Sequence, residues 1–288
     1  MHILENKHLK IAIKNEGAEL TSIQKKETNT EYLWQADPAH WGRHAPVLFP
    51  IVGRLKEDTY KIGKKKFSMK QHGLARNSTF SLLKQDPYSI TFELNSDKKS
   101  LKQYPFPFRL HIQYALKEND LIVFYRVINP AKEALYFSIG GHPAFNCPLK
   151  KGEKRSDYQL VFEKKETAAT QRLTAGIRNG IQVPILKDKK KLPITDNLFA
   201  EDALVFQNLR SEKVSLQKGK EKILSFNFKG FPYLGIWSKN ESAPFVCIEP
   251  WYGVADKQEH NQVLKDKEGI IHLEGNSSFD CYYVITIH

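Results

Sequence analysis

The sequence has few cysteines and no long apolar run, and each shortage excludes a class of protein. Its three cysteines lie far apart with no CxxC pair, which argues against a disulfide framework and a cysteine-based zinc site. No segment approaches the roughly 18 consecutive apolar residues of a transmembrane helix. Residues 1–7 also lack the apolar core of a secretion signal. We therefore expect a cytoplasmic protein with no membrane partner.

Helical periodicity and nucleotide-binding motifs are lacking as well. The chain contains no GxGxxG turn, no P-loop and no HExxH motif. Instead, apolar and polar residues alternate with period two in many short segments separated by turn residues. We predict an all-β protein, a large antiparallel β-sandwich forming a single domain over residues 1–288, with long loops at 150–155 and 168–179. The clearest strand-like segments are 9–13, 88–94, 108–114, 121–128, 158–162, 223–228 and 282–287.

Charge is unbalanced, with a formal net charge of +12. Runs of three lysines at 64–66 and 189–191 would suit a phosphate backbone. Both runs lie beside turn residues, however, and lysines are spread along the whole chain without interleaved aromatic residues. Solvated turns explain the runs better, so we expect no nucleic-acid partner. The positive charge could still favour an anionic substrate, such as a sugar phosphate, by raising its local concentration.

Residues able to carry chemistry stand beside glycines at the ends of strand-like segments. In 137–146 an apolar run ends in two glycines, His142 and a proline, which would hold the imidazole at a sheet edge. His72 precedes a glycine, and Arg54 follows one. A lone histidine is more often structural, and an arginine serves a surface salt bridge as readily as sugar hydroxyls. Because two histidines occupy similar turns, we predict a shared site for a neutral hydroxylated substrate.

The segment 245–256 carries the most convincing carboxylate. An apolar strand ends at Glu249, and a proline, Trp251 and Tyr252 follow. A carboxylate at the end of a buried strand is costly unless it is paired or functional. Partial desolvation would raise its pKa from about 4.3 and make it a better base near neutral pH. The two aromatic rings offer faces for stacking a sugar, while a capped salt bridge is the alternative role for the carboxylate.

In combination and in this order, the motifs resemble one known family, the galactose mutarotase-like aldose 1-epimerases, and within it the LacX-like branch. The resemblance covers nearly the whole chain and implies a large antiparallel β-sandwich, a sugar in a concave cleft, and no metal or organic cofactor. By resemblance, His142 is the general acid and Glu249 the general base. His72 and Arg54 would bind and polarise the sugar near its ring oxygen, and Asp202 would hold its hydroxyls. The motifs are YLWQ at 32–35, Trp41, PVLFP at 46–50, QHG at 71–73, GGHPAF at 140–145 and EPW at 249–251.

The implied activity interconverts the α and β anomers of a hexose by ring opening and reclosure, but other functions stay open. A hexose-6-phosphate 1-epimerase would need basic residues at the cleft rim, for which Arg43, Arg76 and Arg109 are candidates. A non-catalytic carbohydrate-binding protein would keep the tryptophans without needing both His142 and Glu249. A glycosidase would need a second carboxylate across the bond, which the sequence does not offer. The sugar and the oligomeric state are not indicated, a homodimer being one option.

Overall fold

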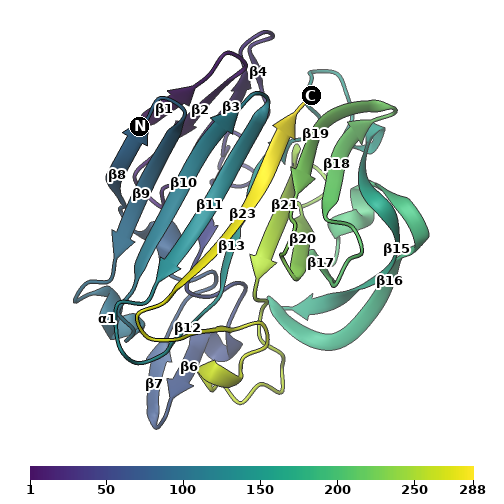
Figure 1. Ribbon diagram of the computed structural model, residues 1–288. Helices are drawn as coiled ribbons and strands as arrows, with labels where there is room; N and C mark the ends of the chain where they lie inside the picture. The colour runs from purple at the N-terminus through teal and green to yellow at the C-terminus, as the bar shows by residue number, and fades with distance from the viewer.

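The computed structural model describes residues 1–288 and is built around a nine-stranded antiparallel sheet. Strands β8 to β11 and β23 face the viewer in Figure 1, and the β15–β16 hairpin curls away at the right. In spatial order the sheet contains β16 (Ile177–Pro193), β15 (Tyr158–Thr174), β18 (Lys213–Lys218), β19 (Glu221–Asn227), β23 (Ser278–Ile287), β11 (Asp120–Ile128), β10 (Arg109–Lys117), β9 (Ser89–Asn95) and β8 (Ser81–Asp86).

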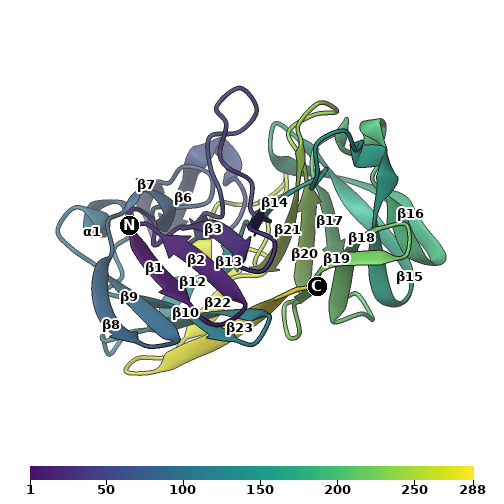
Figure 2. The same cartoon turned by 90° about the horizontal axis from the view of Figure 1, so that it is seen from above.

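A six-stranded sheet lies against the concave side of this sheet, between the two ends that Figure 2 shows as β8 and the β15–β16 hairpin. Its path is β17 (Leu204–Gln207), β20 (Tyr233–Trp237), β21 (Phe245–Tyr252), β13 (Ile139–Gly141) and β5 (Val47–Leu48), and β14 (Ala144–Asn146) also pairs with β21. The smaller sheets are β1 (His2–Glu5) to β2 (Leu9–Ile13), β3 (Leu20–Lys25) and β4 (Thr30–Glu31), then β6 (Thr59–Ile62) with β7 (Lys65–Ser68), and β12 (Leu135–Phe137) with β22 (Ile271–Leu273).

Helical segments are short connections. They are α1 (Ser100–Gln103) and the 3-10 turns η1 (Lys56–Asp58), η2 (Ala75–Asn77), η3 (Arg155–Asp157), η4 (Asp196–Phe199) and η5 (Leu264–Asp266). No helix has the length and apolar character that crossing a membrane requires. Residues alternate between buried and more exposed positions along β10 and β11, so one face of the large sheet packs inward. A continuous cluster of 61 buried hydrophobic residues joins this face to the six-stranded sheet.

The predicted all-β sandwich is confirmed, and each of the strand-like segments overlaps a strand. The predicted loop at 168–179 is wrong, because β15 and β16 pass through it as a hairpin that turns at Ala175 and Gly176. Both turn residues have positive φ, as a two-residue hairpin turn requires. The apolar strand at 245–256 also differs from prediction, since β21 continues beyond Glu249 to Tyr252.

Candidate functional site

An interruption in the sheet places His142 over the middle of β21. On one side β21 pairs without a break with β20, whereas on the other side it pairs first with β14 and then with β13. His142 and Pro143 connect these two short strands and leave the ladder opposite Glu249. Pro250 has no backbone N–H to donate. It is tolerated inside β21, because an N–H at this position would point toward the interruption in the ladder. Ile248, whose N–H points the same way, bonds instead to the carbonyl of Pro143.

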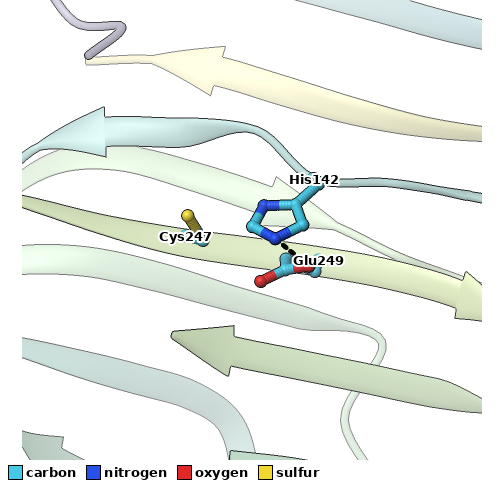
Figure 3. Close-up of side chains that lie close together, drawn as sticks. All are labelled: His142, Cys247 and Glu249. Carbon is cyan, nitrogen blue, oxygen red and sulfur yellow. Dashed lines mark ion pairs between the residues drawn. The ribbon is translucent and has the colours of Figure 1, made fainter. Parts of the chain in front are cut away.

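Side chains at alternate positions of β21 share one face, so Cys247, Glu249 and Trp251 line up beneath His142. Figure 3 shows the imidazole above the carboxylate, with the thiol beside them. Nε2 of His142 lies 3.2 Å from Oε2 of Glu249, and the carboxylate side chain is 1% exposed. The intervening residues Val246 and Ile248 point into the hydrophobic core. The strand therefore carries the core on one face and polar chemistry on the other.

Burial controls the protonation of this pair. It raises the pKa of Glu249 well above its ordinary value, and the nearby charge of Asp202 raises it further. It also lowers the pKa of His142 to about 3. The contact between the two groups lacks hydrogen-bond geometry, and Oε2 of Glu249 and Nδ1 of His142 have no hydrogen-bond partner. We therefore assign an uncharged pair, in which the carboxyl group of Glu249 is protonated and the imidazole of His142 is neutral. The atoms without hydrogen-bond partners are available to a ligand.

Aromatic rings enclose the imidazole of His142 on three sides. The ring of Trp41 stacks on it at a centroid distance of 4.9 Å. Trp237 and His72 meet it edge-on at 5.5 Å and 5.6 Å. These contacts fix the ring orientation and shield three sides of the imidazole from water, which is consistent with the lowered pKa of His142.

His72 is held as a neutral hydrogen-bond donor. Its backbone has φ of 66°, a left-handed conformation that places the side chain at the turn after Gln71. The N–H of Gly53 donates to Nδ1 at 3.2 Å, so the ring proton must sit on Nε2. Burial, followed by repulsion from His142 in its protonated form and from two arginines, holds the pKa of His72 well below 6.5. A neutral Nε2–H can donate to a sugar oxygen without carrying charge.

These residues line a cleft of about 250 Å³. The structure brings together five of the residues predicted to act in catalysis or sugar binding: His72, His142, Asp202, Glu249 and Trp251. Trp41 and Arg76, which the sequence analysis also names, line the same cleft. Asp202 is exposed at the cleft, with φ of 78° and a carboxylate that accepts the N–H of Ala203. The ring of Trp251 closes the floor, because it covers positions where glycines stand on both neighbouring strands.

The structure does not bring Arg54 to the cleft. Its guanidinium forms two hydrogen bonds with Asp58, at 2.8 Å and 2.9 Å, and a third with the carbonyl of Ala175. The side chain packs behind Gly176, which itself lines the cleft. Arg54 thus supports the tip of the β15–β16 hairpin from outside.

Sequence reasoning missed several lining residues, namely Trp237, Arg178 and Lys239. Trp237 could have been found, because it is one of only four tryptophans and ends a strand just before a turn. Arg178 lies in the stretch that the sequence predicted as a loop. It is buried, and its guanidinium donates to the carbonyl of Ala255 and pairs with Glu268.

Two further features are weaker candidates for a reactive centre. A neighbouring cavity of about 360 Å³ contains one buried carboxylate, Glu166, but this group is satisfied by Ser211 and by the N–H of Arg210. Ligand atoms of His142, Cys247 and Glu249 lie within 4.8 Å of one another, close enough to share a metal ion. Burial raises the pKa of the Cys247 thiol well above its usual range, which opposes the thiolate form that metals bind.

Comparison with known proteins decides the family. The family model described as aldose 1-epimerase matches residues 1–268. The chain belongs to the aldose 1-epimerase family. The plasmid-encoded LacX protein of Lactococcus lactis subsp. lactis is 34% identical over 294 residues, spanning 99% of this chain and 98% of that protein. The predicted resemblance is therefore confirmed, and the protein is an isomerase of the aldose 1-epimerase type.

Solved structures of similar proteins agree with this aldose 1-epimerase assignment. A galactose mutarotase related enzyme from Lactobacillus acidophilus has a TM-score of 0.95 at 36% identity, covering 100% of this chain and 97% of that chain. A galactose mutarotase-like protein from Lactobacillus casei has a TM-score of 0.93 at 31% identity, covering all of both chains. The galactose mutarotase-like fold thus extends over the whole chain.

Proposed function

We propose that this aldose 1-epimerase interconverts the anomers of a hexose, with Glu249 as general base and His142 as general acid. The observation that carries the proposal is the 3.2 Å separation between Nε2 and Oε2 in a buried cleft. The anomeric hydroxyl and the ring oxygen of a pyranose are bonded to the same carbon, so an acid and a base acting on them must lie side by side. A glycosidase instead places its two carboxyl groups about 5–9.5 Å apart.

One proton in the pair is sufficient for the reaction. In the reactive form the proton is on Nε2 of His142 and Glu249 is a carboxylate. The carboxylate takes the proton of the anomeric hydroxyl while the imidazolium protonates the ring oxygen, and the C1–O5 bond breaks to give the open-chain aldehyde. Rotation about C1–C2 and the reverse transfers close the ring as the other anomer. The pair holds one proton before and after each turnover.

The rest of the cleft supplies binding and orientation. The neutral Nε2–H of His72 is suited to a sugar oxygen, and Asp202 can accept hydrogen bonds from hydroxyls. Trp41 and Trp251 present apolar faces to the sugar ring. Support for a sugar substrate also comes from the family and from relatives described as galactose mutarotase-like.

Optical rotation of freshly dissolved α-D-glucose and α-D-galactose tests the proposal. We expect wild-type protein to accelerate mutarotation and Glu249→Gln or His142→Asn to lower kcat by about 10²- to 10⁴-fold, the usual contribution of a proton-transfer group. Calorimetric titration with the same sugars shows whether the variants still bind. Sugar binding without any acceleration by wild-type protein would instead identify a carbohydrate-binding protein on this fold.

A further inference from the structure

Two neighbouring arginines, one of which lines the cleft, form no ion pair with a carboxylate. Arg76 lines the cleft, and its guanidinium donates to the carbonyl of Gln71 at 2.7 Å, while its Nε is buried without a hydrogen-bond partner. Arg43 donates to the carbonyl of Arg76 and to the side chain of Asn77. In contrast, Arg178 in the same cleft is paired with Glu268. Neither of the first two guanidinium groups forms an ion pair, and Glu19, the carboxylate whose charge acts on Arg76, is itself paired with Lys14.

The positive charge is uneven within the cleft. Arg43 and Arg76 both act on His72 and His142, whose pKa values they lower after the larger effect of burial. The pKa of Arg76 itself is lowered to about 10, by burial first and then by Arg43. Asp202, the exposed carboxylate of the lining, acts on Glu249. The histidine side of the cleft is thus cationic, and Lys239 adds a further lining amine that forms no ion pair.

The position of this positive charge indicates which part of the substrate would carry a negative charge. In a hexopyranose, carbon 6 is attached to the carbon next to the ring oxygen, and the ring oxygen is the atom that His142 protonates. A substituent on carbon 6 therefore falls on the histidine side. We propose that the substrate is a hexose 6-phosphate and that Arg43 and Arg76 hold its phosphate. This inference rests on the proposed epimerase function, because the orientation of the sugar follows from the roles of His142 and Glu249.

Anomer exchange at equilibrium, followed by NMR, measures the preference directly. We expect kcat/KM for glucose 6-phosphate or galactose 6-phosphate to exceed that for the free sugar at least about 100-fold, with enzyme-free blanks subtracted. Arg43→Gln and Arg76→Gln should each reduce this ratio about 10- to 100-fold, as expected for one charge-assisted hydrogen bond. Arg109→Gln is the matched control, because Arg109 is exposed on β10 and does not line the cleft. It should keep the wild-type ratio.

Other outcomes separate the two proposals. Turnover of free sugars with an equal or higher kcat/KM than their 6-phosphates, or an unchanged ratio in both arginine variants, overturns the phosphate site and leaves the epimerase standing. If wild-type protein turns over none of these sugars, the proposed function fails. Calorimetric binding of glucose 6-phosphate to Glu249→Gln, with and without Arg76→Gln, then tests the phosphate site without turnover. Equal affinity for glucose and glucose 6-phosphate would refute it.

Discussion

Glu249 shows that one residue can serve function while it destabilises the fold. Its carboxyl group is buried beside the imidazole of His142 and is acted on by the negative charge of Asp202, so its ionised form is poorly stabilised. A raised pKa means that the folded state holds the proton more tightly than the unfolded state. Stability is therefore lost as the pH rises from about 4.5 toward the folded pKa.

Replacement by a neutral isostere should remove this loss. We expect Glu249→Gln to be inactive yet more stable at pH 7 by about 1 kcal/mol, or roughly 2–4 °C in Tm. The gain should shrink as the pH falls toward 4.5, where the carboxyl group is protonated in both states. Thermal unfolding from pH 4.5 to 8 measures it, with Glu259→Gln as an exposed control. A loss of stability at every pH would mean that the carboxylate is well solvated by the fold.

The activity should depend on the single proton held by His142 and Glu249. On the acid side kcat/KM falls only when the pair gains a second proton, which the pKa of about 3 for His142 places at low pH. On the alkaline side it falls when the pair loses its proton, at a pKa well above 4.5 because of burial. We expect a broad plateau with a decline at high pH, measured with galactose against enzyme-free blanks. A steady rise from pH 5 to 9 would contradict this assignment.

The structure and the family resemblance give Arg54 different roles, and substitutions can distinguish them. Its guanidinium is bound to Asp58 and Ala175, so Arg54→Gln and Asp58→Asn should have similar effects. We expect each to lower kcat/KM less than about fivefold, because exposed ion pairs contribute about 1 kcal/mol or less. If the arginine instead bound sugar, its loss would reduce kcat/KM about 10- to 100-fold, and Asp58→Asn would not reproduce it.

At the scale of elements, the wall formed by residues 253–256 is held by a buried ion pair. Nζ of Lys267 lies 3.2 Å from Oδ1 of Asp256 and also donates to the carbonyl of Val254. Both side chains are 1% exposed, and Oδ2 of Asp256 accepts the backbone N–H of Lys56. Burial lowers the pKa of Lys267, so the amine relies on this carboxylate to remain charged. The pair connects the cleft wall to the turn that follows Arg54.

Loss of one partner should therefore destabilise the protein strongly. We expect Lys267→Met to reduce the free energy of unfolding by about 3–5 kcal/mol, because a buried carboxylate is left without its cation. Asp256→Asn combined with Lys267→Met should recover part of this loss. Urea unfolding of the single and double variants measures the coupling. Additive effects in the double variant would show that the two groups do not interact.

Elements also show which parts could be predicted from the sequence. Strands such as β10 and β11 alternate because one face is buried, and this pattern is local. The glycine and proline context of His142 and Glu249 indicated turns and a buried strand, and the family motifs gave the pairing. The β15–β16 hairpin was missed because much of it is only partly buried, which leaves no clear alternation. Arg54 pairs with Asp58 four residues along the chain, but its contact with Ala175 joins segments far apart in the sequence, and no local pattern predicts it.

At the scale of the whole molecule, which has a net charge of +12, basic residues occur both in the cleft and in exposed segments that do not line it. Lys64, Lys65 and Lys66 are exposed at the β6–β7 hairpin, and the run at 189–191 is exposed on β16. None of these lysines lines the cleft. At physiological ionic strength charges are screened beyond about 8 Å, so the exposed runs should act on a substrate only at low salt. Charges inside the cleft are screened less.

The dependence of kcat/KM on ionic strength should therefore distinguish the charges in the cleft from the exposed lysine runs. We expect kcat/KM for glucose 6-phosphate to fall about tenfold between 0.01 M and 0.5 M salt, because long-range attraction and the arginine contacts both weaken, while kcat/KM for free glucose stays nearly constant. Replacing Lys64, Lys65 and Lys66 by Gln should reduce the value at 0.01 M but change it less than about twofold at 0.15 M. An equal effect of the triple replacement at both salt concentrations would mean that these lysines contact the substrate, which their absence from the cleft lining argues against.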